Sequence, residues 1–194
     1  MRKVLGKTMH SIFAVFLIWQ SIQLFNRIIY SSKSSSFPDL IVNAILINLF
    51  ITGIFTIVYS FPIYKMLPES YFKIKNPKQL MFLNKLIKIE IFRILLVSTI
   101  WSKQNNKKHF FNGTRKGFIE FEENTRKSEF GHFVPFILII FMTIYVGIFN
   151  DLNKAIWIFL INIPFNFYPF ILQRFHRMRL NRLKFNCKQN RQKI

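Results

Sequence analysis

The chain has 194 residues, 51% of them hydrophobic and 25 of them Phe, yet it carries a formal net charge of +20. A soluble domain rarely combines these extremes, whereas an integral membrane protein places apolar residues in its spans and Lys and Arg beside them. The basic residues flank apolar segments and do not gather on a recognition helix or an aromatic sheet, so we expect no nucleic-acid partner. The single Cys excludes an internal disulfide.

Four segments are apolar and long enough to cross a bilayer. They cover residues 9–30, 39–62, 133–149 and 155–173. Pro164 and Pro169 lie inside the last segment and are expected to kink it. The sequence therefore predicts an all-α integral membrane protein with four transmembrane helices, formed as a single domain by residues 1–194.

Two strongly basic segments lie outside these spans, at 64–131 and 174–194. Within the first, residues 86–101 begin with Lys88, Glu90 and Arg93 among apolar residues and end as an apolar run. This pattern favours an amphipathic helix that lies in the membrane interface over a further span.

The basic residues also predict the orientation of the chain. Three Lys or Arg precede the first span, fourteen lie from Lys65 to Lys127 and eight from Arg174 onward, while the two short loops hold only Lys33 and Lys154. Four spans place the three basic segments on one side, with 25 of the 28 Lys and Arg. We therefore expect both termini on the cytoplasmic side of the cytoplasmic membrane.

Glu129 and His132 stand three residues apart at the beginning of the third span. In a helix they share one face, and a carboxylate that orients an imidazole at the lipid boundary suits acid/base chemistry on a lipid. The same spacing fits an ordinary interfacial hydrogen bond or ion pair, and the sequence leaves both open. Carboxylate-bridged metal bundles use two such pairs and additional Glu, so we expect no metal.

Three motifs follow one another along the chain: P-E-S-Y-F at 68–72, T-R-K-S-E-F-G-H at 125–132, and N-x6-Q-R-F-H-R-M-R-L at 166–180. They resemble the patterns P-[DE]-x-Y-F, T-[KR]-x-[AS]-E-x-x-H and N-x6-Q-R-[YF]-x-R-P-R-L of the glycosyl-4,4'-diaponeurosporenoate acyltransferase family. The similarity covers roughly 67–183. Met178 stands where the family pattern has Pro, and His176 where Asn is usual.

The resemblance implies a small membrane enzyme that esterifies a sugar hydroxyl of a carotenoid glycoside, or a related glycolipid, with a fatty acyl group. An acyl thioester, acyl-CoA or acyl carrier protein, would be the donor, with no tightly bound cofactor. His132 is then the candidate base, and Glu129 fixes its tautomer. Residues expected to bind substrate, the arginines through phosphates or a lipid head group, are Asn166, Gln173, Arg174, Arg177, Arg126 and Thr125.

The alternative is a non-catalytic membrane protein, either an assembly partner or a small transporter subunit. The intramembrane amides would then join helices, and the arginines would be an ordinary positive flank. No G-x-S-x-G elbow and no glycine-rich phosphate loop is present in the sequence. The acyl chain, the acceptor and the oligomeric state are left open.

Overall fold

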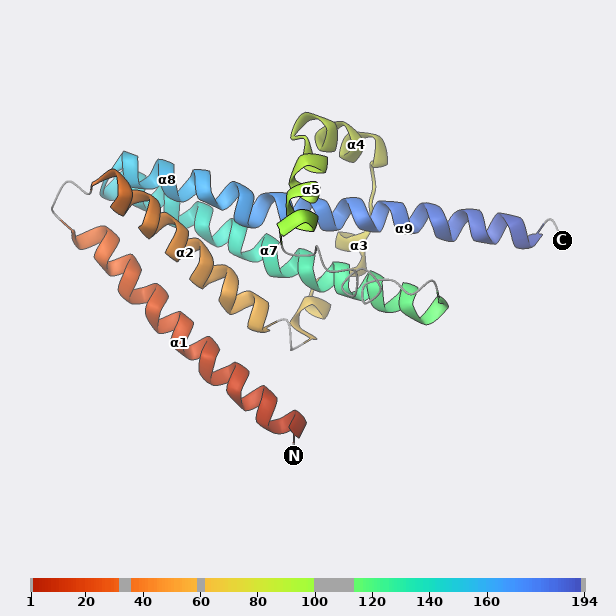
Figure 1. The fold of residues 1–194 in the computed structure, drawn as a ribbon, viewed down its shortest axis with the longest axis horizontal. Helices are drawn as coiled ribbons and strands as arrows, with labels where there is room; N and C mark the ends of the chain where they lie inside the picture. The colour runs from red at the N-terminus through yellow and green to blue at the C-terminus, as the bar shows by residue number, and fades with distance from the viewer. Residues whose placement is uncertain (1, 32–35, 59–61, 100–113, 193–194) are drawn as a thin grey trace. The chain divides into compact units, whose positions relative to one another are not determined.

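The computed structural model describes residues 2–31, 36–58, 62–99 and 114–192. Within these ranges the chain forms helices and connecting turns and contains no strand, which confirms the all-α prediction. Figure 1 follows the elements in order. They are α1 (Arg2–Tyr30), α2 (Phe37–Val58), η1 (Pro62–Met66), α3 (Glu69–Phe72), α4 (Pro77–Leu86), α5 (Ile89–Thr99), α7 (Arg115–Phe149), α8 (Leu152–Asn162), η2 (Ile163–Phe167) and α9 (Tyr168–Gln192).

Four helical stretches are long and apolar enough to cross a membrane. They are Thr8–Tyr30, Phe37–Ile57, Lys116–Phe149 and Leu152–Leu183. Each contains most of one predicted span, so the chain is an integral membrane protein with about four transmembrane helices. The end of the second predicted span, at 59–61, lies outside the described residues.

The third predicted span belongs to a much longer helix than expected. We expected a span from Phe133, but α7 already begins at Arg115. Its first turns continue as helix because charges of opposite sign stand four residues apart. Lys127 lies 3.2 Å from Glu123, and Arg126 lies 3.3 Å from Glu122. The polar motif at 125–132 is therefore helical throughout.

The expected amphipathic helix corresponds to α5. Ile89 is fully buried, while Ile91, Ile94 and Leu95 are exposed, as an interfacial helix requires. Residues 100 and 101, the predicted end of this helix, lie outside the described residues. A separate helix, α4, precedes α5, and the turn between them includes Lys88 in the left-handed backbone region, with φ 49°.

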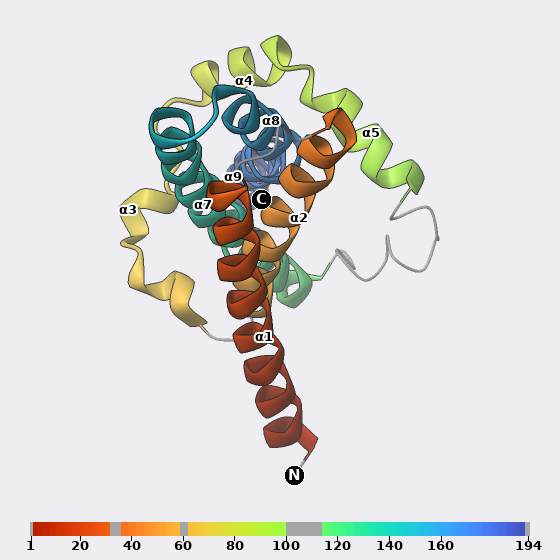
Figure 2. The same ribbon diagram turned by 90° about the vertical axis from the view of Figure 1, so that its left-hand side faces the viewer.

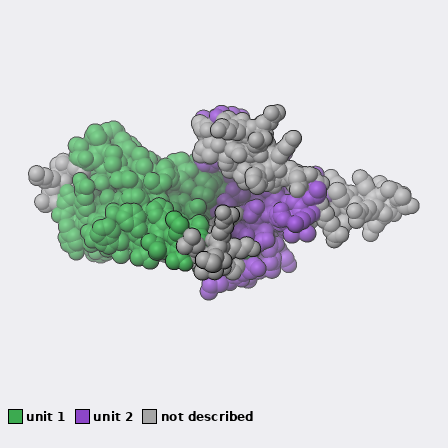
Figure 3. All heavy atoms as spheres, turned by 60° about the horizontal axis from the view of Figure 1, so that its bottom comes forward, with its two compact units in different colours: residues 1–64, 130–169 green, residues 65–129, 170–194 purple. Residues whose placement is uncertain are grey.

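The chain divides into two compact units, coloured in Figure 3. Unit 1 comprises Met1–Tyr64 and Phe130–Pro169, and unit 2 comprises Lys65–Glu129 and Phe170–Ile194.

Unit 1 is a bundle in which α2 packs against both α1 and α8 (Figures 1 and 2). Its core contains Ile47 from α2, Ile139 from α7 and Ile158 from α8. At one end Lys154 is buried, and its Nζ donates to the carbonyl oxygens of Ile28 and Ser31 and to the side chain of Asn150. Three acceptors thus compensate for burying this ammonium group.

The fourth apolar stretch is interrupted as its prolines predict. Pro164 lies in η2, a π-helical turn at Ile163–Phe167 between α8 and α9. A proline in a helix lacks the N–H donor and displaces the preceding carbonyl, so the local hydrogen bonding must rearrange. The helix resumes at Tyr168 and continues through the basic tail to Gln192.

Candidate active site

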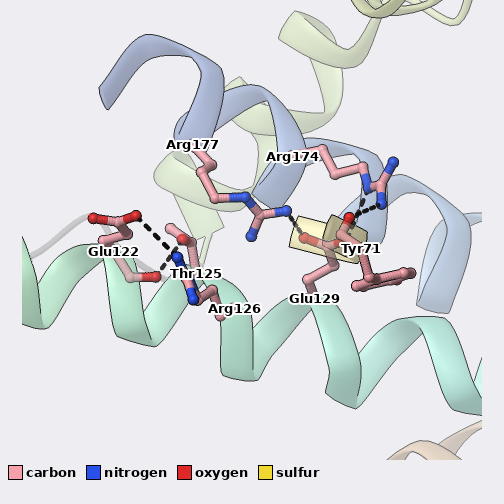
Figure 4. A network of polar contacts seen from close by, with 7 residues as sticks. All are labelled: Tyr71, Glu122, Thr125, Arg126, Glu129, Arg174 and Arg177. Atoms are coloured by element: carbon pink, nitrogen blue, oxygen red, sulfur yellow. Dashed lines mark hydrogen bonds and ion pairs between the residues drawn. The ribbon is translucent and has the colours of Figure 1, made fainter. Parts of the chain in front are cut away.

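Unit 2 contains a buried ion cluster (Figure 4). Glu129, on α7, is completely buried, and each of its oxygens binds one arginine of α9. Arg174 Nε donates to Oε1 at 2.8 Å, and Arg177 Nη2 donates to Oε2. The two arginines stand three residues apart and share one face of α9. A buried carboxylate is tolerable here because both its oxygens accept charge-assisted hydrogen bonds.

Tyr71, on the short helix α3, completes the cluster. Arg174 Nη2 donates to its carbonyl oxygen at 3.0 Å, and the Arg174 guanidinium lies 5.0 Å from the centre of its ring. Burial raises the pKa of the Tyr71 hydroxyl, and the negative charge of Glu129 raises it further. Tyr71 therefore stays protonated beside Glu129 at neutral pH and can act as a hydrogen-bond donor.

Arg126 and Thr125, which we expected to bind substrate, lie on α7 with partners of their own. Arg126 donates to Glu69 at 2.6 Å and to Glu122 at 3.3 Å. The buried Thr125 hydroxyl donates to the carbonyl oxygen of Glu122 at 2.7 Å. Glu69 belongs to the loop and short helix of the first motif, so this ion pair ties that motif to the second.

Arg177 is only 1% exposed, and Glu129 occupies only one of its nitrogens. Its Nε and Nη1 are buried without a hydrogen-bond partner among the described residues. Its guanidinium group also lies 5.4 Å from the centre of the Phe72 ring, a cation–π contact that offsets part of this cost. Unsatisfied buried donors are rare in proteins, so these two nitrogens call for an explanation.

Within unit 2 the carboxylate of Glu129 is bound by two arginines, and its expected role toward His132 stays a prediction. Within unit 1 the His132 ring lies beside the side chain of Asn166 and the backbone of Phe165, and its Nδ1 is buried without a partner among the described residues. The spacing of three residues placed the two side chains correctly on one helix. It could not show that two arginines from α9 occupy the carboxylate.

Asn166 belongs to a network of buried amides in unit 1. Its Nδ2 donates to Asn162 at 2.9 Å and to Asn48 at 3.4 Å, and its Oδ1 accepts from Thr52 at 2.9 Å. Asn162 in turn donates to the carbonyl oxygen of Phe136 at 3.1 Å. These contacts join α2, α7, α8 and η2, so the network connects helices as interhelical amides commonly do.

Gln173 lies in unit 2, is partly buried, and has no hydrogen-bond partner among the described residues. In a regular α-helix Gln173 would fall on the same face as Asn162 and Asn166. The π-helical turn η2 changes the register between Asn166 and Gln173, so a rotation of 100° per residue does not apply across it.

Unit 2 also contains an open pocket with a volume of about 460 Å³. Arg174 lies on its wall, together with Lys73 and Lys75 from the segment between α3 and α4. Leu80 of α4 and Phe170 of α9 contribute apolar surface. The pocket therefore lies directly beside the Glu129 cluster, through Arg174 and Tyr71.

The family model of glycosyl-4,4'-diaponeurosporenoate acyltransferase matches residues 68–184, which is more than half of the chain. The chain belongs to this family. The resemblance seen in the three motifs is thereby confirmed, and the chain is an acyltransferase. A search of curated proteins and a search of solved structures each give no match.

The residues that the acyltransferase family model matches include the whole Glu129 cluster and the residues of the pocket. Sequence reasoning missed Tyr71, Lys73 and Lys75 as site residues. Tyr71 stood within the first motif, which was a usable signal. No sequence signal distinguished Lys73 and Lys75, because they are two of fourteen basic residues in one segment.

Proposed function

We propose that this acyltransferase moves a fatty acyl group from an acyl thioester to a sugar hydroxyl of a carotenoid glycoside or a related glycolipid. Family membership supports the reaction class and the acceptor. The location of the active site is inferred from the fully buried Glu129 with Arg174 and Arg177 bound to it. Fixed cations beside an open pocket provide the positive environment that a developing oxyanion needs.

The reaction requires a base, and we assign this role to His132. The hydroxyl oxygen of the acceptor attacks the thioester carbonyl carbon while His132 takes the hydroxyl proton. The C–O ester bond forms, the C–S bond breaks, and the proton passes to the departing thiolate, so the products are an ester and a thiol. The partnerless Nδ1 supports this assignment because it can accept a proton in the tautomer that carries its hydrogen on Nε2.

We propose a role for Glu129 that differs from the one suggested by its spacing of three residues from His132. Its charge fixes the positions of Arg174 and Arg177. Asn166 takes over the position beside His132, where an amide can fix the orientation of the ring without adding charge. In this proposal Glu129 and Asn166 are positioning residues, and His132 is the catalytic residue.

We further propose that the protein lies in the cytoplasmic membrane with both termini in the cytoplasm. The distribution of Lys and Arg supports this orientation, since 25 of 28 lie in the three segments assigned to one side. Acyl-CoA and acyl carrier protein are cytoplasmic, so this orientation gives the basic segment at 64–131 access to the donor.

Lipid mass spectrometry of the native host, with and without the gene, tests the proposed reaction. A glycolipid or pigment that lacks one acyl chain in the deletion strain identifies acceptor and acyl group together. Complementation with His132→Ala should leave the product at or near the deletion level while the variant still inserts into the membrane. His176→Asn is the matched control, because it removes a histidine and introduces the residue of the family pattern.

Two outcomes would contradict the proposal. An unchanged lipid and pigment profile in a deletion strain, under conditions where the wild-type protein is made, would exclude the reaction. Wild-type product levels in the His132→Ala strain would exclude His132 as the base and leave the reaction itself standing.

A further inference from the structure

The pocket in unit 2 has a lining of one charge sign. Lys73, Lys75 and Arg174 line it, and no Asp or Glu among the described residues does. Both lysines are exposed, and neither has an ion-pair partner within the described part of the chain. Two unpaired lysines on one concave surface, beside an arginine that shares its counter-charge Glu129 with Arg177, form an attractive site for a multiply charged anion.

Arg174 has the geometry of a binding group on this wall. Its Nε and Nη2 are occupied by Glu129 and by the Tyr71 carbonyl oxygen, whereas its Nη1 has no partner among the described residues. The rings of Tyr71 and Phe170 lie 5.0 and 5.3 Å from the guanidinium carbon. The group is thereby fixed in place before any ligand arrives, so a ligand loses little entropy on engaging it.

The remaining surface of the pocket is mixed. Leu80, Leu83 and Ile171 contribute apolar side chains, and Asn76 and Gln79 contribute amides that bond to each other at 3.0 Å. A volume of about 460 Å³ is within the range of small-molecule sites. A ligand that joins phosphate groups to a long arm of amides and short alkyl chains matches this combination.

We propose that this pocket binds the phosphate-bearing end of the acyl-thioester donor, a coenzyme A type molecule, with the phosphates at Lys73, Lys75 and Arg174. The inference rests on the proposed function for the identity of the ligand. Ammonium groups serve as mobile point charges for phosphate, and a guanidinium binds it through a fixed fork. The thioester carbonyl would then lie toward the Glu129 cluster, which shares Arg174 with the pocket.

Direct binding tests the pocket independently of turnover. Free CoA is titrated into the full-length protein in phosphatidylcholine nanodiscs, and binding is measured by calorimetry. The double variant Lys73→Gln/Lys75→Gln should weaken CoA binding by at least about tenfold, as expected for losing two charge-assisted contacts. The matched control is Lys78→Gln/Lys85→Gln, which removes two exposed lysines of α4 that do not line the pocket.

Steady-state kinetics provides the second readout. With acyl-CoA as donor, the pocket double variant should raise KM by a similar factor and leave kcat within about threefold, since uniform binding is lost. With an acyl N-acetylcysteamine thioester, which has no phosphate, wild type and variant should turn over equally. A charge-preserving Lys73→Arg/Lys75→Arg variant should retain most of the affinity for CoA.

The outcomes separate this proposal from the proposed function. Equal CoA affinity in wild type and in the pocket double variant, or no saturable CoA binding by wild type, overturns the pocket assignment even if acyl transfer is observed. Absence of acyl transfer from every thioester overturns the proposed function even if CoA binds. If phosphatidylglycerol nanodiscs abolish CoA binding by wild type at high salt as well as low, the pocket holds a lipid head group, and the donor assignment is wrong.

Discussion

In unit 1 the polar groups buried between the helices are neutral amides, whereas in unit 2 they are charged. Asn48, Asn162 and Asn166 bond to one another, to Thr52 and to main-chain oxygens. Unit 1 also buries Lys154, at its end, where three oxygens accept from it. In unit 2 Glu129 pairs with two arginines, and one of them, Arg177, has two buried donors without a partner among the described residues.

The two units differ in the free-energy cost of burying these polar groups. Amides that hydrogen-bond to one another stabilise helix association at a modest cost in free energy and need no ligand as a partner. A buried carboxylate with arginines carries a large desolvation penalty, and apolar residues of similar volume often stabilise a protein more. Its presence in unit 2, beside an open pocket, is best explained by the positive charge that it positions. Three substitutions test this division, in order of decreasing effect.

Glu129→Gln should have the largest effect, because it leaves Arg177 buried without a counter-charge. We expect a loss of about 3–5 kcal/mol in unfolding free energy, together with loss of acyl transfer. Thermal unfolding in detergent and product formation in membranes provide the two measurements. The control Glu120→Gln removes an exposed carboxylate of the same helix and should change stability by less than about 1 kcal/mol. Equal melting temperatures for the two variants would show that the cluster does not stabilise unit 2.

Asn166→Leu should have an intermediate effect. It removes the donor to Asn162 and the acceptor for Thr52, and interhelical hydrogen bonds of this kind contribute about 0.5–2 kcal/mol. Stability should therefore fall by less than in Glu129→Gln, and acyl transfer should fall through the lost orientation of His132. Asn26→Leu, at an exposed position of α1, is the matched control. A destabilisation equal to that of Glu129→Gln would contradict the distinction between neutral and charged networks.

Tyr71→Phe should have the smallest effect at neutral pH and a clear one in alkali. Because the pKa of Tyr71 is raised in the folded protein, its contribution to stability is complete below the unfolded value of about 10 and is lost as pH rises above it. The wild-type protein should therefore lose more stability between about pH 10 and 12 than the Phe variant does. Parallel melting curves for both proteins over this range would show that the pKa of the Tyr71 hydroxyl is not raised in the folded protein.

The sequence by itself determined the helical spans and the family. Four apolar segments of sufficient length predict four membrane-crossing helices, because the length and hydropathy of a helix decide whether it is stable across a lipid bilayer. The three motifs indicated the acyltransferase family, and they include Glu129, His132, Arg174 and Arg177. Helical spacing also placed the two arginines on one face.

Only the tertiary structure decided which of these residues meet. The partner of a side chain is fixed by the element that packs against it, and Glu129 on α7 meets Arg174 and Arg177, which lie far along the chain on α9. The π-helical turn η2 interrupts the regular α-helical spacing between Asn162 and Gln173. Lys73 and Lys75 line a pocket together with residues of α9. No local pattern in a basic segment distinguishes these two lysines from their neighbours.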